Sequence, residues 1–383
     1  MPDGQEMVFG GFEPGPQAEV HVRDDRFFRR CVAAGDVGFG ESYVASEWDT
    51  PDIASVISWF LANTDQSPSV SGSAASKWRV NLFRWVNRIA HRLRANSLSN
   101  SRRNIHEHYD LGNEFYALWL DSTMTYSSGL FLSPELTLEQ SQLAKYDALC
   151  RKLKLCASDH LLEIGTGWGG FACHAASRYG CRVTTVTISE EQHRHALRRV
   201  ESEGLAGRID VRLQDYRSLS GSYDKIASIE MLEAVGDEYL EVYFAQCDRL
   251  LKADGLLGLQ FINSPDSRYD EFRNGVDWIQ KHIFPGSLCP SIWRVGEAIR
   301  NTGDLFLHHL DDFGLSYART LREWRERFNE RRDGLESLGF DSAFQRKWNY
   351  YLAYCEAAFA MRNISVVQAI YTRPNNRTLM RQS

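Results

Sequence analysis

Three closely spaced glycines follow an acidic residue near the middle of the chain. Glu163, Gly165, Gly167 and Gly169 form the pattern ExGxGxG between a predicted strand and a predicted helix. Glycines at such a turn let the backbone approach a ligand closely, and the first turn of the helix has free N–H groups. A dinucleotide loop has the spacing GxGxxG, whereas the third glycine here comes one residue earlier. This spacing is typical of an S-adenosylmethionine loop; the alternative is a glycine-rich turn that binds no ligand.

Polar residues after the next two predicted strands are placed to hold the rest of that cofactor. A carboxylate usually binds the ribose hydroxyls after the second strand, but Thr187-Ile-Ser-Glu-Glu-Gln192 follows here. Thr187, Gln192 or one of the two Glu side chains must take that role, or no side chain does. After the third strand, Asp215 is placed to accept from an adenine amine, and Tyr216 to stack on its ring. An Asp in an ordinary surface turn is an equally good interpretation.

Two glutamates, Glu230 and Glu233, lie just past the fourth predicted strand. The C-terminal ends of strands face the ligand crevice in open α/β sheets. A carboxylate in apolar surroundings at that place is a candidate functional group. Both glutamates are close enough to the strand end, and their spacing does not choose between them.

Histidines and cysteines give weaker signals. Two histidine pairs occur, His106 with His108 and His308 with His309. Neither has a third ligand at a recognised spacing, so no metal site is predicted. Cys355 follows an aromatic stretch that begins at Tyr350, and we expect it to be a buried free thiol. The eight cysteines of the chain include no CxxC pair. That pattern favours a reduced, cytosolic protein over a disulfide framework or a zinc site.

The segments that must position these groups alternate between strand and helix. Alternation at this spacing predicts an α/β fold with a doubly wound, mostly parallel sheet. Earlier in the chain, apolar periodicity in residues 25–64 predicts a small helical unit, and the Ser-rich stretch 67–76 predicts a linker. The predicted strands are residues 160–164, 182–187, 209–213, 225–229, 255–262 and 364–371.

Length and composition exclude several classes of protein. The chain has 383 residues and a net charge of −6, which fits two to three domains and argues against a nucleic-acid binder. We find no run of roughly 18 apolar residues, so no membrane-spanning helix is predicted. The first residues are acidic and rich in Gly and Pro, unlike a signal peptide.

Residues 77–103 contain eight basic side chains and no acidic one. Arg84, Arg88 and Arg92 are four residues apart and share one face of a predicted helix, while apolar residues including Trp85 form another face. A basic amphipathic helix of this kind suits an anionic membrane surface. The alternative is a helix that packs on the core and turns its Arg face to solvent.

Together these motifs resemble the cyclopropane fatty acid synthase family, which includes the mycolic acid cyclopropane synthases, over nearly the whole chain. The part through Trp48-Asp-Thr-Pro-Asp52 resembles the extra domain of the family's bacterial phospholipid enzymes. The other segments that carry the resemblance are Ile105–Tyr116, Leu118–Asp121, Met124–Ser128, Glu163–Gly170, Thr187–Gln192, Met231–Gly236, His282–Gly286 and Tyr350–Phe359.

The resemblance implies a fold and a division of the chain. The fold is a seven-stranded Rossmann-like methyltransferase sheet with a smaller helical N-terminal domain. The expected domains are residues 1–66 (helical), 67–103 (linker and basic segment) and 104–383 (catalytic), the last with a lid insertion at residues 264–304. A possible homodimer and a place on the cytoplasmic face of the membrane are also implied.

The resemblance further implies an activity. Enzymes of the family transfer a methylene from S-adenosylmethionine to a cis double bond in a phospholipid acyl chain. The alkene attacks the sulfonium methyl, a carbocation forms, and a base removes a proton from the new methyl so that the ring closes. The base implied is a bound bicarbonate. The alternatives are a small-molecule methyltransferase of the same fold and a lipid-binding protein without catalysis.

Site residues follow from the same motifs. Tyr126 and Tyr317 would face the carbocation, which aromatic rings stabilise. The implied holders of bicarbonate are Ser128, Glu233, Gln260, Ile262 and Tyr317. The implied cofactor contacts are Tyr126, Ser127, Glu163, Gly165, Gly167, Gly169, Thr187, Gln192, Asp215 and Tyr216.

Two residues depart from the family's pattern. Ser128 stands where the family has Cys, and Gln260 stands where it has His. Both can still donate hydrogen bonds, Ser128 partly through its backbone. A changed base site leaves room for a methyl-branched or methylene product. Cys355 matches a cysteine once proposed as catalytic, although the mechanism gives a thiol no necessary role.

Overall fold

The computed structural model describes residues 1–10, 14–63 and 111–380. The predicted linker and basic segment, residues 67–103, lie outside this part of the chain. So do residues 105–110, the first half of one family motif. Among the described residues, no helix is long and apolar enough to cross a lipid bilayer.

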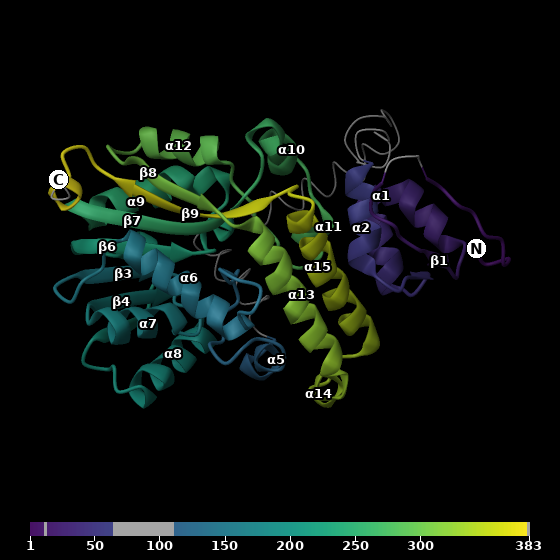
Figure 1. The fold of residues 1–383 in the computed structure, drawn as a ribbon, viewed down its shortest axis with the longest axis horizontal. Helices are drawn as coiled ribbons and strands as arrows, with labels where there is room; N and C mark the ends of the chain where they lie inside the picture. The colour runs from purple at the N-terminus through teal and green to yellow at the C-terminus, as the bar shows by residue number, and fades with distance from the viewer. Residues whose placement is uncertain (11–13, 64–110, 381–383) are drawn as a thin grey trace.

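One sheet of seven strands forms the centre of the described part of the chain (Figure 1). Its strand order is β5-β4-β3-β6-β7-β9-β8. The pairs from β5 through β7 are parallel, and β9 runs antiparallel to both of its neighbours. The prediction of a doubly wound, mostly parallel sheet is therefore confirmed. The strands are β3 (His160–Ile164), β4 (Arg182–Thr187), β5 (Ile209–Leu213), β6 (Tyr223–Ile229), β7 (Leu251–Asn263), β8 (Phe306–Asp312) and β9 (Ser365–Thr372).

Side chains along these strands alternate between two hydrophobic cores. Leu161 of β3 packs on the face that α6, α7 and α8 cover, and Leu162 packs on the face that α9 and α12 cover. Both faces are buried, which explains why the strands read as nearly continuous apolar runs. The covering helices are α6 (Leu138–Lys152), α7 (Gly170–Tyr179), α8 (Glu190–Ser202), α9 (Leu240–Leu250) and α12 (Ile292–Arg300).

The strand β8 has no counterpart among the six strands that the sequence predicts. Within the described residues it lies at the edge of the sheet and pairs with β9 alone. Phe306 and Leu307 are 49% and 42% exposed, and the register shifts between Leu307 and His309. Its sequence lacks the apolar pattern of a buried strand because one side of an edge strand meets solvent.

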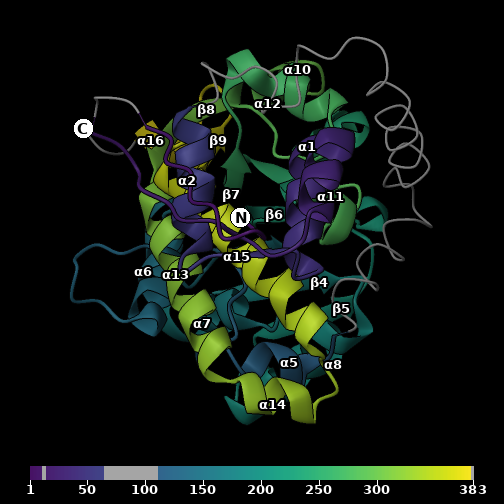
Figure 2. The same ribbon diagram turned by 90° about the vertical axis from the view of Figure 1, so that its right-hand side faces the viewer.

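The N-terminal residues form two helices and a short ribbon that pack against α15 (Figures 1 and 2). Trp48 is fully buried and belongs to the same hydrophobic core as Trp348 of α15. These helices therefore share a core with the C-terminal helices, and the division into domains stays a prediction. The elements are β1 (His21–Val22), α1 (Arg26–Val44, kinked at Gly35), β2 (Trp48–Asp49), α2 (Ile53–Ala62) and α15 (Ser342–Ala360).

The chain between β7 and β8 forms short helices, the last of which, α12, covers one face of the sheet. This is the segment that we expect to act as a lid, and that role stays a prediction. Its elements are η5 (Asp266–Arg268), α10 (Tyr269–Asn274), α11 (Trp278–His282) and α12. The remaining elements are α5 (Asn113–Ala117), η2 (Tyr216–Ser218), η3 (Leu232–Ala234), η4 (Asp237–Tyr239), α13 (Gly314–Glu330), α14 (Arg332–Ser337) and α16 (Arg377–Met380).

Arg346 of α15 fastens the N-terminal helices to the rest of the fold. Its Nε donates to the carbonyl oxygen of Tyr43 at 2.8 Å, and its Nη2 donates to that of Trp48 at 3.0 Å. The guanidinium also lies 3.8 Å from the centre of the Tyr43 ring. We predict that Arg346→Ala lowers the free energy of unfolding by about 2 kcal/mol, since it removes two hydrogen bonds from a charged donor. Urea unfolding measures this, with exposed Arg331→Ala as control; equal unfolding curves would refute the role.

Candidate active site

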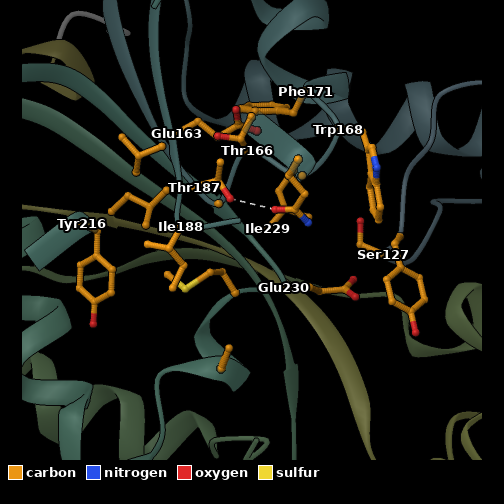
Figure 3. Close-up of a pocket in the computed structure, with 18 of the residues that line it drawn as sticks. Ser127, Glu163, Thr166, Trp168, Phe171, Thr187, Ile188, Tyr216, Ile229 and Glu230 are labelled. Carbon is orange, nitrogen blue, oxygen red and sulfur yellow. Dashed lines mark hydrogen bonds between the residues drawn. The ribbon is translucent and has the colours of Figure 1, made fainter. Parts of the chain in front are cut away.

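A pocket lies at the carboxyl ends of β3, β4 and β6 (Figure 3). Its lining comes from the chain before α6, the glycine loop, the ends of those strands and η2. This is where the crossovers of an open α/β sheet leave room for a ligand. Nine of the ten implied cofactor residues line this pocket: Tyr126, Ser127, Glu163, Gly165, Gly167, Thr187, Gln192, Asp215 and Tyr216. Gly169 is not among the lining residues.

The glycine loop takes a shape that glycine permits. Gly165, Gly167 and Gly169 all have positive φ, at 101°, 53° and 86°, a region that other residues rarely adopt. A Cβ on Gly167 would meet no atom within 4 Å, so that glycine leaves open space in the pocket. Gly169 caps the N-terminus of α7, whose first N–H groups are available to a ligand.

Glu163 is a buried acid at the base of this loop. Its Oε2 accepts a hydrogen bond from the Thr185 hydroxyl at 2.5 Å. Burial raises the pKa of the Glu163 carboxyl to about 8. Trp168, from the same loop, donates through Nε1 to Asn113 of α5 at 2.7 Å, which ties the loop to a motif earlier in the chain.

Polar side chains at the ends of β4 and β5 are already held in place by the protein. Thr187 donates to the side-chain oxygen of Gln192 at 2.9 Å, and both residues are buried. Asp215 receives a two-pronged contact from Arg217, at 2.9 and 2.7 Å. The role of Asp215 toward an adenine stays a prediction. Arg217 also lines the pocket, and sequence reasoning did not single it out.

The chain before α6 brings Tyr126 and Ser127 to the pocket. The Tyr126 hydroxyl lies 2.7 Å from that of Tyr351, and the Lys145 ammonium donates to the Ser127 hydroxyl at 2.5 Å. Lys145 is fully buried, and burial lowers its pKa to about 7. Our sequence reasoning missed this lysine. The available signal was its position on the buried face of α6, four residues before Leu149.

Three hydrogen bonds from separate segments of the chain hold the Glu230 carboxylate at the pocket. Its Oε1 accepts from the backbone N–H of Ser128 at 2.9 Å and from Nε2 of Gln260 at 2.8 Å. Its Oε2 accepts from the Tyr317 hydroxyl at 2.7 Å. Figure 3 shows the carboxylate pointing across the pocket toward the chain that carries Ser127. Three expected site residues thus converge on one carboxylate that the sequence left undecided.

Glu233 has different surroundings. Its Oε1 accepts from the backbone N–H of Ile262 at 2.5 Å, while its Oε2 is buried with no hydrogen-bond partner among the described residues. Glu233 is not among the residues that line the pocket, whereas Glu230 is. Burial, followed by the charge of Glu230, raises the pKa of Glu233 to about 8.

The donors expected to hold bicarbonate are therefore engaged by the chain's own carboxylates. Ser128, Gln260 and Tyr317 bind Glu230, and Ile262 binds Glu233. A bicarbonate ion would have to displace the Glu230 carboxylate to reach the same donors. The residues as placed do not fit this anion, which differs from the expectation that the resemblance raised.

Cys355 lies apart from this arrangement. It sits on α15, packed against the aromatic core, and is not among the residues that line the pocket. Burial raises its pKa well above the usual range, so the group is held as a thiol. In the described ranges, no cluster of His, Cys, Asp and Glu side chains is arranged to hold a metal ion.

Comparisons with known proteins agree with this geometry. The family model for mycolic acid cyclopropane synthetase matches residues 96–369. Tuberculostearic acid methyltransferase UfaA1 of Mycobacterium tuberculosis is 38% identical over 94% of this chain and 84% of its own length. The cyclopropane-fatty-acyl-phospholipid synthase of Escherichia coli K12 is 34% identical over 93% of this chain and 88% of its own length.

Solved structures give the same result. The crystal structure of mycolic acid cyclopropane synthase CmaA1 complexed with SAH and CTAB is 28% identical and covers 71% of this chain and 98% of its own, with a TM-score of 0.65. The Rossmann-like sheet and its glycine-loop pocket are those of an S-adenosylmethionine-dependent methyltransferase. Within that class, the chain belongs to the mycolic acid cyclopropane synthetase family.

The positive φ of Gly165 makes the loop easy to test. A Cβ there would be strained at φ 101° and would press on Met231 at 3.3 Å. A left-handed backbone costs an L residue about 1–2 kcal/mol, so Gly165→Ala should displace the loop. We predict that its affinity for S-adenosylhomocysteine falls about tenfold. Titration calorimetry measures this against Gly204→Ala, which has φ 69° outside the pocket; equal losses in both variants would contradict the prediction.

Proposed function

We propose that this protein transfers a one-carbon unit from S-adenosylmethionine to a cis double bond in a phospholipid acyl chain, with a cyclopropane ring as the product. The observation that supports this most is the half-buried Glu230 carboxylate, which lines the cofactor pocket and has aromatic residues beside it. A base next to the methyl donor, in surroundings that exclude water, is what carbocation chemistry requires.

Aromatic residues supply the second requirement, a low-energy place for a cation. Tyr126 lines the pocket, and its ring centre lies 5.4 Å from that of Trp324. Tyr317 donates to Glu230 and lies 4.3 Å from the ring centre of Phe359. Ring faces stabilise positive charge without bonding to it. S-adenosylmethionine, when bound, supplies an electrophilic methyl group; these rings hold the acyl chain and shield the cation from water.

There are two other candidate functions, and one of them has support among the relatives. UfaA1 is named a tuberculostearic acid methyltransferase, which favours a fatty-acyl C-methyltransferase that leaves a methyl or methylene branch. A small-molecule methyltransferase of the same fold is the other candidate. Both relatives are named for reactions on fatty acids or phospholipids, so a lipid acceptor is the substrate class that we propose.

We predict a product that separates these candidates. The purified protein is incubated with trideuteromethyl S-adenosylmethionine and anionic vesicles of cis-monounsaturated phospholipid, and the released fatty acids are analysed by mass and NMR. A ring should keep two of the three deuterium atoms and lose the double bond, because the base removes one. A methylene branch would also keep two deuterium atoms but would show a double bond by NMR, and a methyl-branched alkene formed by loss of a chain proton would keep all three.

Controls make the result interpretable. Vesicles with saturated acyl chains should accept no label, since they have no π bond to attack. Absence of label from unsaturated lipid, while S-adenosylhomocysteine still binds, would refute the proposed substrate class and favour a small-molecule acceptor.

We also propose that the protein works at the cytoplasmic face of an anionic membrane; the homodimer that the resemblance implies stays a prediction. The support is the basic segment 77–103, which lies outside the described residues, and the need to reach acyl chains. Each basic residue near an anionic leaflet contributes on the order of 1 kcal/mol. We predict that Arg84→Gln, Arg88→Gln and Arg92→Gln together weaken binding to anionic vesicles by more than tenfold. Co-sedimentation measures this; unchanged binding would refute the role of this segment.

A further inference from the structure

The place where an anion would bind at this site, here called the oxyanion position, is occupied by a side chain of the protein. A planar carboxylate sits where three donors from distant parts of the chain converge: the N–H of Ser128, the amide of Gln260 and the hydroxyl of Tyr317. Bicarbonate presents the same planar pair of oxygens to its partners. Carboxylate and anion therefore compete for one set of donors, and only one of them can occupy it.

From this geometry we propose that the Glu230 carboxylate is the catalytic base and that the protein needs no bicarbonate. The inference rests on the proposed function, because it assigns the deprotonation step of that reaction to a side chain. Glu230 qualifies by position, since it lines the cofactor pocket and Glu233 does not.

The orientation of the Gln260 amide is set by a chain of contacts that ends at Glu230. Lys152 donates to Oε1 of Gln368 at 2.7 Å, and Nε2 of Gln368 donates to Oε1 of Gln260 at 3.1 Å. The oxygen of Gln260 is thereby used, and its NH₂ group is turned toward Glu230 at 2.8 Å. A glutamine fixed in this way is a permanent donor, suited to a partner that is always present.

The backbone of Glu230 gives an independent reason to assign it a function. Its φ is +47°, in the left-handed region that favours glycine. Residues kept in this region cost free energy, and the fold retains them where the surroundings hold them for a purpose. Here the strained turn after β6 aims a carboxylate at the three donors. A glycine would relieve the strain and leave an empty oxyanion position.

Neighbouring charges favour an ionised Glu230. Burial raises the pKa of Glu230, while the nearby Lys145 lowers it. The hydrogen bonds that Glu230 accepts from Tyr317, Gln260 and Ser128 lower it further. Glu233 has no such cation among its influences, and the charge of Glu230 raises its pKa further. The pair therefore divides into a carboxylate at Glu230 and a carboxylic acid at Glu233, so Glu230 is the member of the pair that can accept a proton.

Methyl transfer, deprotonation and ring closure need no added reagent. The π pair of the alkene forms a bond to the donated methyl carbon, and the C–S pair leaves on sulfur. The neighbouring carbon is now a cation. Glu230 takes a proton from the new methyl, and the freed C–H pair closes the ring onto the cationic carbon. The proton stays on Glu230 until the product leaves and solvent re-enters.

Two variants test the assignment in the full-length protein. Glu230→Gly opens the oxyanion position, and Glu230→Gln keeps its shape without a base. We expect both to bind S-adenosylhomocysteine within about threefold of the unmodified protein. Glu230→Gly should methylate lipid at under a hundredth of the normal rate in carbonate-free buffer and recover at least tenfold with added bicarbonate or formate. Glu230→Gln should gain nothing from either anion.

Lys154→Gly is the matched control for the glycine. Lys154 also has a positive φ, at 50°, and is not among the residues that line the pocket. This variant should keep the normal rate with or without bicarbonate. A merely structural role for Glu230 predicts loss of folding, with no rescue by a small anion. Full activity of Glu230→Gly in carbonate-free buffer would overturn the proposal.

A binding measurement separates this inference from the proposed function. Isotopically labelled bicarbonate is added to each protein in complex with S-adenosylhomocysteine, and its NMR signal is followed. We expect a bound signal with Glu230→Gly and none with the unmodified protein. A bound signal in the unmodified protein, lost on adding formate, would overturn the inference whatever acceptor the enzyme methylates.

Discussion

The half-buried carboxylate of Glu230 must be matched by donors, because a charge withdrawn from water without partners costs free energy. The three donors that match it come from the chain before α6, from β7 and from α13. Each of those segments must be placed to within a hydrogen-bond length for the site to exist. The register of β6 against β7 and the packing of α13 on the aromatic core therefore both position groups around the Glu230 carboxylate. Lys145 on α6 completes it with a nearby positive charge.

Two adjacent residues, Ser127 and Ser128, connect the cofactor pocket with the proposed base. Ser127 lines the pocket, and the N–H of the next residue, Ser128, binds Glu230. Ser127 is itself fixed by Lys145 and by Gln142 of α6. A shift of α6 would thus disturb the methyl donor's pocket and the base together. This coupling keeps the transferred methyl group and the proton acceptor in a constant relation, which a fast reaction of a short-lived cation requires.

Much of the fold could be predicted from sequence because its signals are local. Six strands and the glycine loop follow from apolar runs and from glycine spacing, and β3, β4 and β5 have the expected bounds. The strand β8 could not be found, because an edge strand with exposed Phe306 and Leu307 lacks a buried pattern. Spacing left Glu230 and Glu233 open and the resemblance selected Glu233, because the role of Glu230 depends on φ at that residue and on donors from distant segments. Lys145 was missed because a lone lysine on a helix reads as solvent-exposed until its burial is known.

The dependence of the unmodified enzyme on bicarbonate tests this account most directly. Lipid methylation is measured in buffer freed of carbon dioxide, with S-adenosylmethionine and cis-unsaturated vesicles, and bicarbonate is then added in steps. The account predicts a normal rate at the start that bicarbonate does not raise, because Glu230 already occupies the donors of Ser128, Gln260 and Tyr317. A rate near zero that rises and saturates with bicarbonate would show that an anion, and not Glu230, removes the proton.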